Sequence, residues 1–283
     1  MKSGFATILG RSNVGKSTLL NRLIGTKVAI TTPKPQTTRR PIQGIYTTDE
    51  GQIVFVDTPG IMQKSRDGLT KKLLEFVKES LKGVEVVLYV CDPTRAIGNE
   101  EKQALKLVEN ITLPKLLVIN KMDDRKSKDY LEMYRALEKD FDAVVEVSAK
   151  TGSNLNYITE WIYDRLKEGE FMYPPHQVSN ISREEQLSEI IREKLFLRLR
   201  QEVPYSTHVV VHNVEEKKNG TIHVDAVIYT SDDRYKSMII GKGGQGIREI
   251  GQAARKELEG ASGKRFYLAL KVDVDKRWVE TSL

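Results

Sequence analysis

The sequence has few of the residues that form disulfides and zinc sites, and it has no long hydrophobic run. Its 283 residues include one cysteine and four histidines. Cys91 cannot form a disulfide within the chain, which is typical of a reducing cytoplasm, and so few ligands argue against a zinc site. No apolar run approaches the roughly 20 residues needed to cross a bilayer. The first strand-like run begins directly after residues 1–4, so we expect no secretory signal.

Length and composition indicate a protein with two domains of ordinary size. Hydrophobic residues make up 39% and charged residues 30% of the chain, enough for a packed core in each domain. The net charge of +6 permits nucleic-acid binding, but the positive excess is shared by both halves. A nucleic-acid site must therefore be argued from a local motif.

The stretch from Gly10 to Ser17 fits G-x-x-x-x-G-K-[ST], a glycine-rich turn that binds phosphate. The apolar run Phe5–Leu9 before it is typical of a strand, and Thr18–Ile24 after it is typical of a helix. Such a corner points backbone N–H groups and the helix dipole at one anion. We expect Lys16 to reach the terminal phosphates and Ser17 to ligate magnesium. The candidate nucleotide-binding residues here are Gly10, Arg11, Ser12, Asn13, Val14, Gly15, Lys16, Ser17 and Thr18.

Strand-like and helix-like segments alternate through the first half of the chain. The expected strands are Phe5–Leu9, Ile42–Thr47, Gln52–Val56, Val84–Val90, Lys115–Ile119 and Ala143–Val147. After the first helix, the expected helices are Leu69–Leu81, Glu100–Glu109, Tyr130–Lys139 and Leu155–Leu166. This alternation predicts an α/β fold, a mostly parallel six-stranded sheet with helices on both faces. The turn Thr48–Gly51 predicts an antiparallel hairpin at one edge.

Four further motifs lie at the carboxyl ends of these strands or in a loop, where ligands bind such sheets. They are Gln36-Thr37-Thr38-Arg39, Asp57-Thr58-Pro59-Gly60 with Ile61, Asn120-Lys121-Met122-Asp123, and Ser148-Ala149-Lys150. Asp57 is placed to hold magnesium, and Thr38 can close over the metal only while a γ-phosphate is present. Short motifs of this kind arise singly by chance, but the ordered set predicts a nucleotide hydrolase.

The third of these motifs predicts the base. A carboxylate such as Asp123 can accept two hydrogen bonds, from the N1–H and the exocyclic amine of guanine. Adenine offers no such pair of donors, so the motif favours GTP over ATP. A backbone N–H from the segment Ser148–Lys150 can in addition bind the guanine carbonyl.

These motifs resemble a known family. Residues 4–167 resemble the translation-factor-related small GTPases, whose signatures are the five motifs. The P-loop and the stretch Pro35–Arg39 resemble in particular the Era family of bacterial GTPases with a C-terminal KH domain, in the TrmE-Era-EngA-YihA-Septin-like superfamily. This family usually has proline in place of Ser12, so we expect a slightly more flexible loop. The resemblance implies hydrolysis of GTP to GDP and phosphate with Mg²⁺, through Ser17, Thr38 and Asp57.

Two positions bear on the rate of hydrolysis. Many signalling GTPases have a glutamine that orients the attacking water where this chain has Ile61, so intrinsic hydrolysis is expected to be slow or to use another group. Relatives with the P-loop asparagine can bind K⁺ beside the phosphates, as Asn13 could. Asn13 could equally only shape the loop through backbone hydrogen bonds.

The remainder of the chain predicts a second α/β domain. Residues 169–181 break the periodicity and contain Pro174 and Pro175, which is typical of a linker. A capping box at Ser182–Glu185 then opens a segment that reads helix, strand, strand, helix, helix, strand. The two central helices flank Gly241–Gly244, the Gly-x-x-Gly loop that lets a nucleic-acid backbone approach closely.

This order resembles the type II KH fold, an RNA-binding module. The candidate RNA-binding residues are Ile239, Ile240, Gly241, Lys242, Gly243, Gly244 and Arg248. Arg255 could extend a basic stripe, although a solvated helix face explains it as well.

The sequence thus predicts a GTPase domain at residues 1–168, a linker at 169–181 and a KH domain at 182–283. Family resemblance implies a cytoplasmic monomer that binds the 3′ region of small-subunit ribosomal RNA during assembly of the small ribosomal subunit. It also implies loose association with the inner face of the cell membrane. The alternative is an RNA-binding scaffold whose nucleotide site is structural, with negligible turnover.

Overall fold

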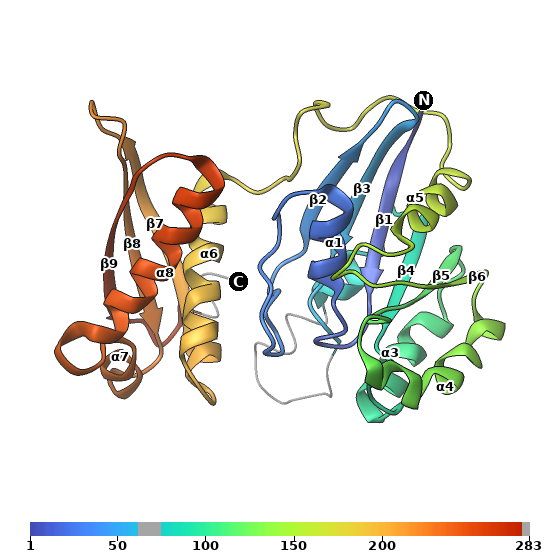
Figure 1. Ribbon diagram of the computed structural model, residues 1–283, viewed down its shortest axis with the longest axis horizontal. Helices are drawn as coiled ribbons and strands as arrows, with labels where there is room; N and C mark the ends of the chain where they lie inside the picture. Colours follow the sequence, from blue (N-terminus) through green and yellow to red (C-terminus); the bar gives the residue numbers. More distant parts are fainter. Residues whose placement is uncertain (62–74, 279–283) are drawn as a thin grey trace. The chain divides into compact units, whose positions relative to one another are not determined.

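The computed structural model describes residues 1–61 and 75–278 (Figure 1). The chain forms two compact units, which are described separately. The first comprises Met1–Thr31 and Thr38–Asn180, and the second comprises Thr32–Thr37 and the residues from Ile181 on. Among the described residues, no helix combines the length and apolar character that a membrane span requires.

The first unit is built on a six-stranded sheet with the strand order β2-β3-β1-β4-β5-β6. Five strands run parallel: β1 (Lys2–Leu9), β3 (Gly51–Asp57), β4 (Val86–Cys91), β5 (Lys115–Ile119) and β6 (Ala143–Glu146). The edge strand β2 (Ile42–Thr47) runs antiparallel to β3. The predicted mostly parallel sheet and its edge hairpin are therefore confirmed.

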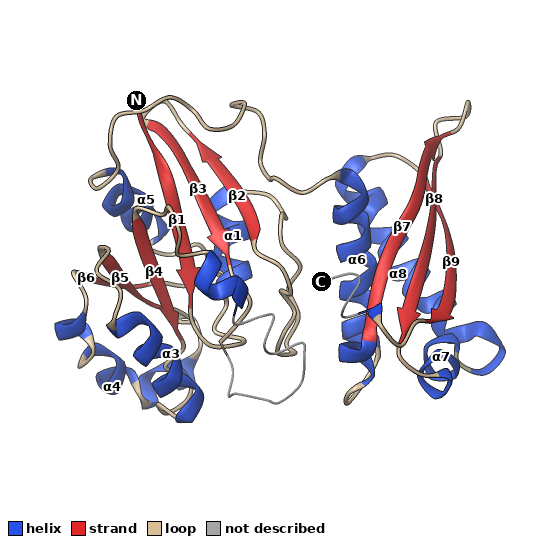
Figure 2. Ribbon diagram, turned by 180° about the vertical axis from the view of Figure 1, so that it is seen from behind, coloured by secondary structure: helices blue, strands red, loops and turns tan. Residues whose placement is uncertain are grey.

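Helices cover both faces of this sheet (Figures 1 and 2). They are α1 (Lys16–Ile24), α3 (Asn99–Glu109), α4 (Leu131–Arg135) and α5 (Leu155–Tyr163). Helix α1 packs on β2 and β3, and α5 packs on β1 and β3. Helices α3 and α4 contribute Val108 and Tyr134 to a core with Tyr89 and Cys91. Cys91 is a buried free thiol within this core.

Two predicted helices differ from the structure. A single helix over Tyr130–Lys139 is wrong, because α4 lies between 3₁₀ segments at Arg125–Asp129 and Glu138–Asp140. After α4 the N–H of Leu137 donates to the carbonyl of Tyr134 (3.1 Å), which is the tighter 3₁₀ pattern, and Leu137 packs against the core. The helix predicted over Leu69–Leu81 begins outside the described residues, and its residues 75–79 are helical.

The chain after α5 packs along the edge of the sheet instead of leaving it directly. The buried Gln52 amide donates to the carbonyl of Tyr173 (2.9 Å), and its Oε1 accepts the N–H groups of Met172 and Tyr173 (2.9 Å each). Further along, Ser179 forms a bridge with Gly44 of β2. This segment therefore pairs with the outer edge of β2.

The second unit has the predicted order of elements. Its elements are α6 (Arg183–Arg198), β7 (Thr207–Glu216), β8 (Ile222–Thr230), α7 (Asp233–Ile240), α8 (Gln245–Ser262) and β9 (Phe266–Val274). Strand β8 pairs antiparallel with β7 and parallel with β9. Ser182 begins α6 with the predicted capping box to Glu185. Helices α6, α7 and α8 pack on one face of this sheet through Leu195, Ile239 and Ile250.

Candidate nucleotide site and RNA interface

The phosphate-binding turn connects β1 to α1 and depends on glycine. Gly15 has a φ of +100°, and a Cβ on it would lie 2.4 Å from the Asn120 amide nitrogen. Only glycine therefore allows the turn and the strand end after β5 to approach this closely. Gly60 lies against Ser12 in the same way, with a Cβ 2.6 Å from the Ser12 Cα. Three of the five predicted motifs therefore meet at one point: the P-loop, Asp57–Gly60 and Asn120–Asp123.

Lys16 is buried at the centre of this turn. Its Nζ donates to the carbonyls of Gly10 (3.1 Å) and Arg11 (3.0 Å). Burial lowers the pKa of Lys16 to about 8, against the attraction of Asp57. A phosphate at this point would supply the anionic partner that favours the charged form of Lys16.

The three predicted magnesium ligands lie together. The Ser17 hydroxyl donates to Asp57 Oδ2 (2.6 Å), and Thr38 Oγ1 lies 3.0 Å from Ser17 Oγ and 3.3 Å from Asp57 Oδ2. The other carboxylate oxygen, Oδ1, is buried and has no hydrogen-bond partner in the structure. Burial raises the pKa of Asp57. Two hydroxyls and a buried carboxylate with a vacant oxygen fit a magnesium ion, which prefers oxygen ligands.

The guanine motif is held against the P-loop. Asn120 donates to the carbonyl of Val14 (2.9 Å) and accepts from the N–H of Ala149 (2.9 Å). Lys121 Nζ donates to the carbonyl of Asn13 (2.8 Å). The structure therefore brings together the P-loop and the ends of β5 and β6.

The two oxygens of Asp123 contact the segment that follows β6. Oδ1 accepts from the Ser148 hydroxyl (2.6 Å), and Oδ2 lies 3.4 Å from Lys150 Nζ. The Ser148 hydroxyl holds the pKa of Asp123 below its ordinary value, so the carboxylate is ionised at neutral pH. Two acceptors at the rim of the site match the pair of donors on guanine.

The predicted switch residues have different surroundings. Thr38 reaches Ser17 and Asp57, whereas Gln36 and Thr37 belong to the second unit. Thr37 donates to the carbonyl of Lys34 (2.8 Å), and Arg39 is buried. The chain therefore passes from one unit to the other between Thr37 and Thr38.

Sequence reasoning missed a buried charge cluster beside the P-loop. Arg11 Nε donates to Glu101 Oε2 (2.7 Å), and Glu101 also accepts from the hydroxyls of Tyr89 (2.5 Å) and Tyr134 (3.4 Å). Asp92 Oδ2 lies 3.6 Å from the Arg11 guanidinium and 2.6 Å from Lys121 Nζ. The pKa of Tyr89 is raised by burial and by Glu101, so Tyr89 remains a donor.

Arg11 links this cluster to Ile61: its side chain pairs with Glu101, and its backbone lies beside Ile61. The residues Arg11 and Ile61 form a parallel bridge, and the N–H of Ile61 donates to Gly10 (3.1 Å). Ile61 is itself buried. The position of Asp92 directly after β4, at the carboxyl edge, is the sequence signal that could have revealed the cluster.

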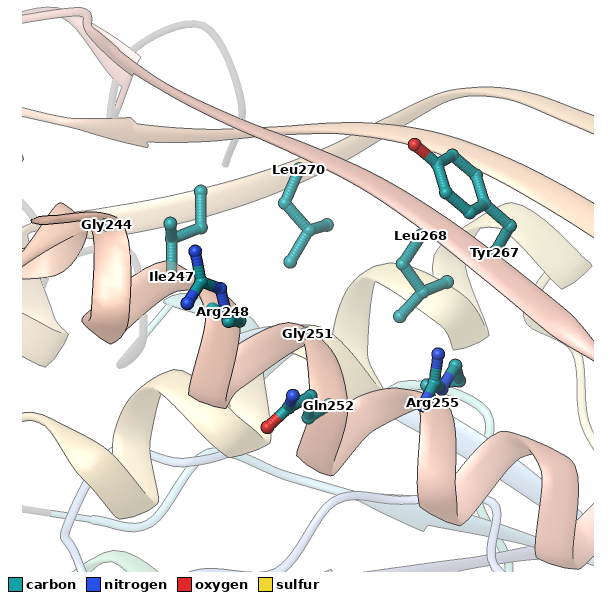
Figure 3. Close-up of a pocket in the computed structure, with 9 residues that line it drawn as sticks. All are labelled: Gly244, Ile247, Arg248, Gly251, Gln252, Arg255, Tyr267, Leu268 and Leu270. Carbon is teal, nitrogen blue, oxygen red and sulfur yellow. The ribbon is translucent and has the colours of Figure 1, made fainter.

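The second unit carries an open groove between α8 and β9 (Figure 3). Its volume is about 480 Å³. Gly244 and Arg248, two of the candidate RNA-binding residues, line it, and Leu268 and Leu270 of β9 point into it. The exposed Arg248 suits the anionic backbone of a single-stranded nucleic acid. The apolar side chains of Leu268 and Leu270 suit the flat faces of unstacked bases.

The other candidate RNA-binding residues differ in exposure. Lys242 and Gly243 are exposed in the loop before α8, where Gly243 has a φ of +58°. Ile240 and Gly241 are half-buried beside them. Ile239 is fully buried in the core of the second unit, so its side chain does not form part of the interface as predicted. It instead anchors α7 in that core.

Comparison with known proteins agrees with these two units. A family model described as 50S ribosome-binding GTPase matches residues 5–121, and one described as KH domain matches residues 202–279. GTPase Era of Halothermothrix orenii is 40% identical over 280 residues, 99% of this chain and 95% of that protein. GTPase Era of Carboxydothermus hydrogenoformans is 41% identical over 280 residues, 98% of this chain and 94% of that protein. The chain belongs to the GTPase Era family.

Solved structures of the Era family match the whole chain. A variant of Aquifex aeolicus Era bound to GDP·AlF₄⁻ is 33% identical with a TM-score of 0.91, covering 100% of this chain and 97% of its own. Era in complex with MgGDPNP and nucleotides 1506–1542 of 16S ribosomal RNA is 33% identical with a TM-score of 0.92, covering 100% and 96%. This member of the Era family is a GTPase, with a P-loop GTPase fold followed by a KH domain. Membership in a family of GTPases argues against the alternative of a purely structural nucleotide site.

Proposed function

We propose that this GTPase binds the 3′ region of small-subunit ribosomal RNA through the groove between α8 and β9, and that it acts in assembly of the small ribosomal subunit. The observation that carries the proposal is the arginine-edged apolar groove beside the exposed glycine loop at Lys242 and Gly243. The Era structure with bound 16S ribosomal RNA supports the choice of RNA.

The description of the matching GTPase model names the other subunit of the ribosome. That model covers only residues 5–121, which exclude the groove, whereas the Era structure with 16S RNA matches the whole chain. We therefore rest the choice of the small subunit on the structure that includes the KH domain.

In the first unit, we propose that the P-loop N–H groups and Lys16 hold the phosphates and that Asp123 recognises guanine. Ser17, Thr38 and Asp57 would hold Mg²⁺, which supplies positive charge to the β- and γ-phosphates. We further propose the domain bounds 1–168, 169–181 and 182–283, a cytoplasmic monomer, and the peripheral membrane association that the family implies.

An RNA titration at fixed salt tests this function. The double substitution Lys242→Asp with Gly243→Asp should abolish RNA binding, because added carboxylates in the loop repel phosphate. GTP turnover without RNA should be unchanged, since both positions lie in the second unit. Native protein that binds the 16S segment no better than an unrelated duplex would contradict the proposal.

A potassium ion at Asn13 is a separate proposal, and the φ of Asn13 allows it to be tested. Asn13 has a φ of +64°, a conformation that alanine disfavours and glycine accepts. If Asn13 holds K⁺, turnover in K⁺ should exceed turnover in Na⁺ by about tenfold or more, as for other cations at a transferring phosphate. Asn13→Gly should remove that difference.

The alternative, in which Asn13 only shapes the loop, predicts another pattern. Asn13→Gly would then turn over GTP like the native protein, while Asn13→Ala would be slower in both salts. Equal rates of the native protein in K⁺ and Na⁺ at the same ionic strength would overturn the potassium site.

A further inference from the structure

The hydroxyl of Ser12 is buried in the P-loop without a partner. Ser12 is 7% exposed, and its Oγ has no hydrogen-bond partner among the residues that the structure describes. A buried hydroxyl of this kind is unfavourable, because it has given up its hydrogen bonds to water and gained none in the protein. Such groups are few in native structures, and a bound ligand, water or ion can supply the missing partner.

Ser12 lies beside the end of the Lys16 side chain. Lys16 Nζ donates to the carbonyl of Arg11 (3.0 Å), the residue directly before Ser12. In a P-loop this lysine reaches the terminal phosphates of the nucleotide. Ser12 therefore belongs to the part of the turn that lies at the terminal phosphates.

The same hydroxyl faces the loop that follows β3. A Cβ on Gly60 would lie 2.6 Å from Ser12 Oγ and 2.8 Å from Ser12 N, so the two segments leave no room for a side chain between them. This loop begins at Asp57, the candidate magnesium ligand whose Oδ1 is also buried and unpartnered within the described chain. The Ser12 hydroxyl thus lies where the segments that would hold the terminal phosphates and Mg²⁺ meet.

The shape of the turn does not depend on this hydroxyl. The Arg11 side chain pairs with Glu101, and its Nη1 donates to the backbone carbonyl of Ser12 (3.4 Å). On the other side, the N–H of Ile61 donates to the carbonyl of Gly10 (3.1 Å). These bonds hold the backbone of the turn without Ser12 Oγ, which leaves the hydroxyl available to a ligand.

We propose that the Ser12 hydroxyl donates a hydrogen bond to a γ-phosphate oxygen of GTP, and that it thereby favours GTP over GDP. A hydroxyl can rotate its proton toward an anion, and a hydrogen bond to a charged acceptor is stronger than one between neutral groups. The proline that the family usually has here carries no hydroxyl, so the usual family pattern does not supply this contact. The inference rests on the proposed nucleotide site and adds a side-chain contact to it.

The test compares two serine-to-alanine substitutions in the full chain. Ser3 is the matched control: it is 8% exposed, its Oγ is likewise unpartnered among the described residues, and it lies near the amino end of β1, whereas the P-loop follows the carboxyl end. Ser12→Ala should weaken binding of MgGDPNP by about tenfold, or ~1.4 kcal/mol, and leave the affinity for MgGDP within about twofold of native. Ser3→Ala should change neither affinity.

Competition against a fluorescent guanine nucleotide measures both affinities, and thermal unfolding of the nucleotide-free protein measures stability. Neither substitution should lower the unfolding midpoint, because neither hydroxyl forms a hydrogen bond within residues 1–61 and 75–278. Equal losses of affinity for MgGDPNP and MgGDP would overturn the inference, and so would native affinity of Ser12→Ala for both. A lower unfolding midpoint of Ser12→Ala would make the hydroxyl a structural group and would also overturn it.

Lys16→Ala separates this result from the proposed function. It should weaken binding of both nucleotides, because this lysine reaches the β-phosphate as well as the γ-phosphate. Native nucleotide binding that Lys16→Ala weakens and Ser12→Ala leaves unchanged removes the serine contact alone. A native protein that binds neither nucleotide removes the proposed site and the inference together.

Discussion

Asp123→Asn is expected to lower the affinity for GTP by about 10²–10³-fold, because one of the two hydrogen bonds is lost, the other loses its charged acceptor, and a donor amide faces a donor on the base. The two carboxylate oxygens of Asp123 lie within reach of Ser148 and Lys150 at the rim of the site. Xanthosine triphosphate should bind the variant better than GTP, since its C2 oxygen can accept from the new amide.

Competition between nucleotides for the purified protein measures this change. Asp124→Asn is the matched control: Asp124 is the next residue, and it caps the following 3₁₀ segment by accepting from Lys126 N–H. That control should keep the native preference for guanine. Equal affinity of the native protein for ATP and GTP would contradict the assignment of Asp123.

Glu101→Ala is expected to reduce the free energy of unfolding of the first unit by about 3 kcal/mol, because the buried Arg11 guanidinium loses its hydrogen-bonded carboxylate and keeps only Asp92, at 3.6 Å. The hydroxyls of Tyr89 and Tyr134 lose their acceptor at the same time. Glu109→Ala is the control, since Glu109 is exposed at the end of the same helix. It should change stability by less than about 0.5 kcal/mol.

Urea unfolding followed by tryptophan fluorescence measures the loss. The chain has two tryptophans, Trp161 in the first unit and Trp278 in the second, so a Trp278→Phe background isolates the first unit. Equal stability of Glu101→Ala and Glu109→Ala would show that the Arg11–Glu101 pair contributes nothing. Joint replacement of Arg11 and Glu101 by Met and Leu should be less harmful than the sum of the single changes.

The sheet could be predicted because its signals are local. Buried runs such as Val86–Cys91 are apolar without interruption, and the glycine stops and the capping box at Ser182 mark helix boundaries. The Mg²⁺ candidates could be predicted for a related reason. Asp57 ends β3, Ser17 lies in the first turn of α1 after the turn that follows β1, and parallel strands bring their carboxyl ends to one edge.

The features that were missed depend on tertiary contacts. Glu101 reads as an ordinary acidic residue in the first turn of a helix, and only the fold places it under Arg11. Ile239 precedes the glycine loop in sequence, yet the helical period turns its side chain into the core.

The segment after α5 that packs along the edge of the sheet has a consequence for aggregation. Edge strands offer unpaired N–H and C=O groups on which other chains can add, and here Val178 accepts from the N–H of Ile45 in β2 (2.9 Å). Removing everything after residue 168 would expose this edge and leave the buried Gln52 amide without its backbone partners. An isolated GTPase unit should therefore stay dispersed when it ends at Asn180 and self-associate through β2 when it ends at Glu168.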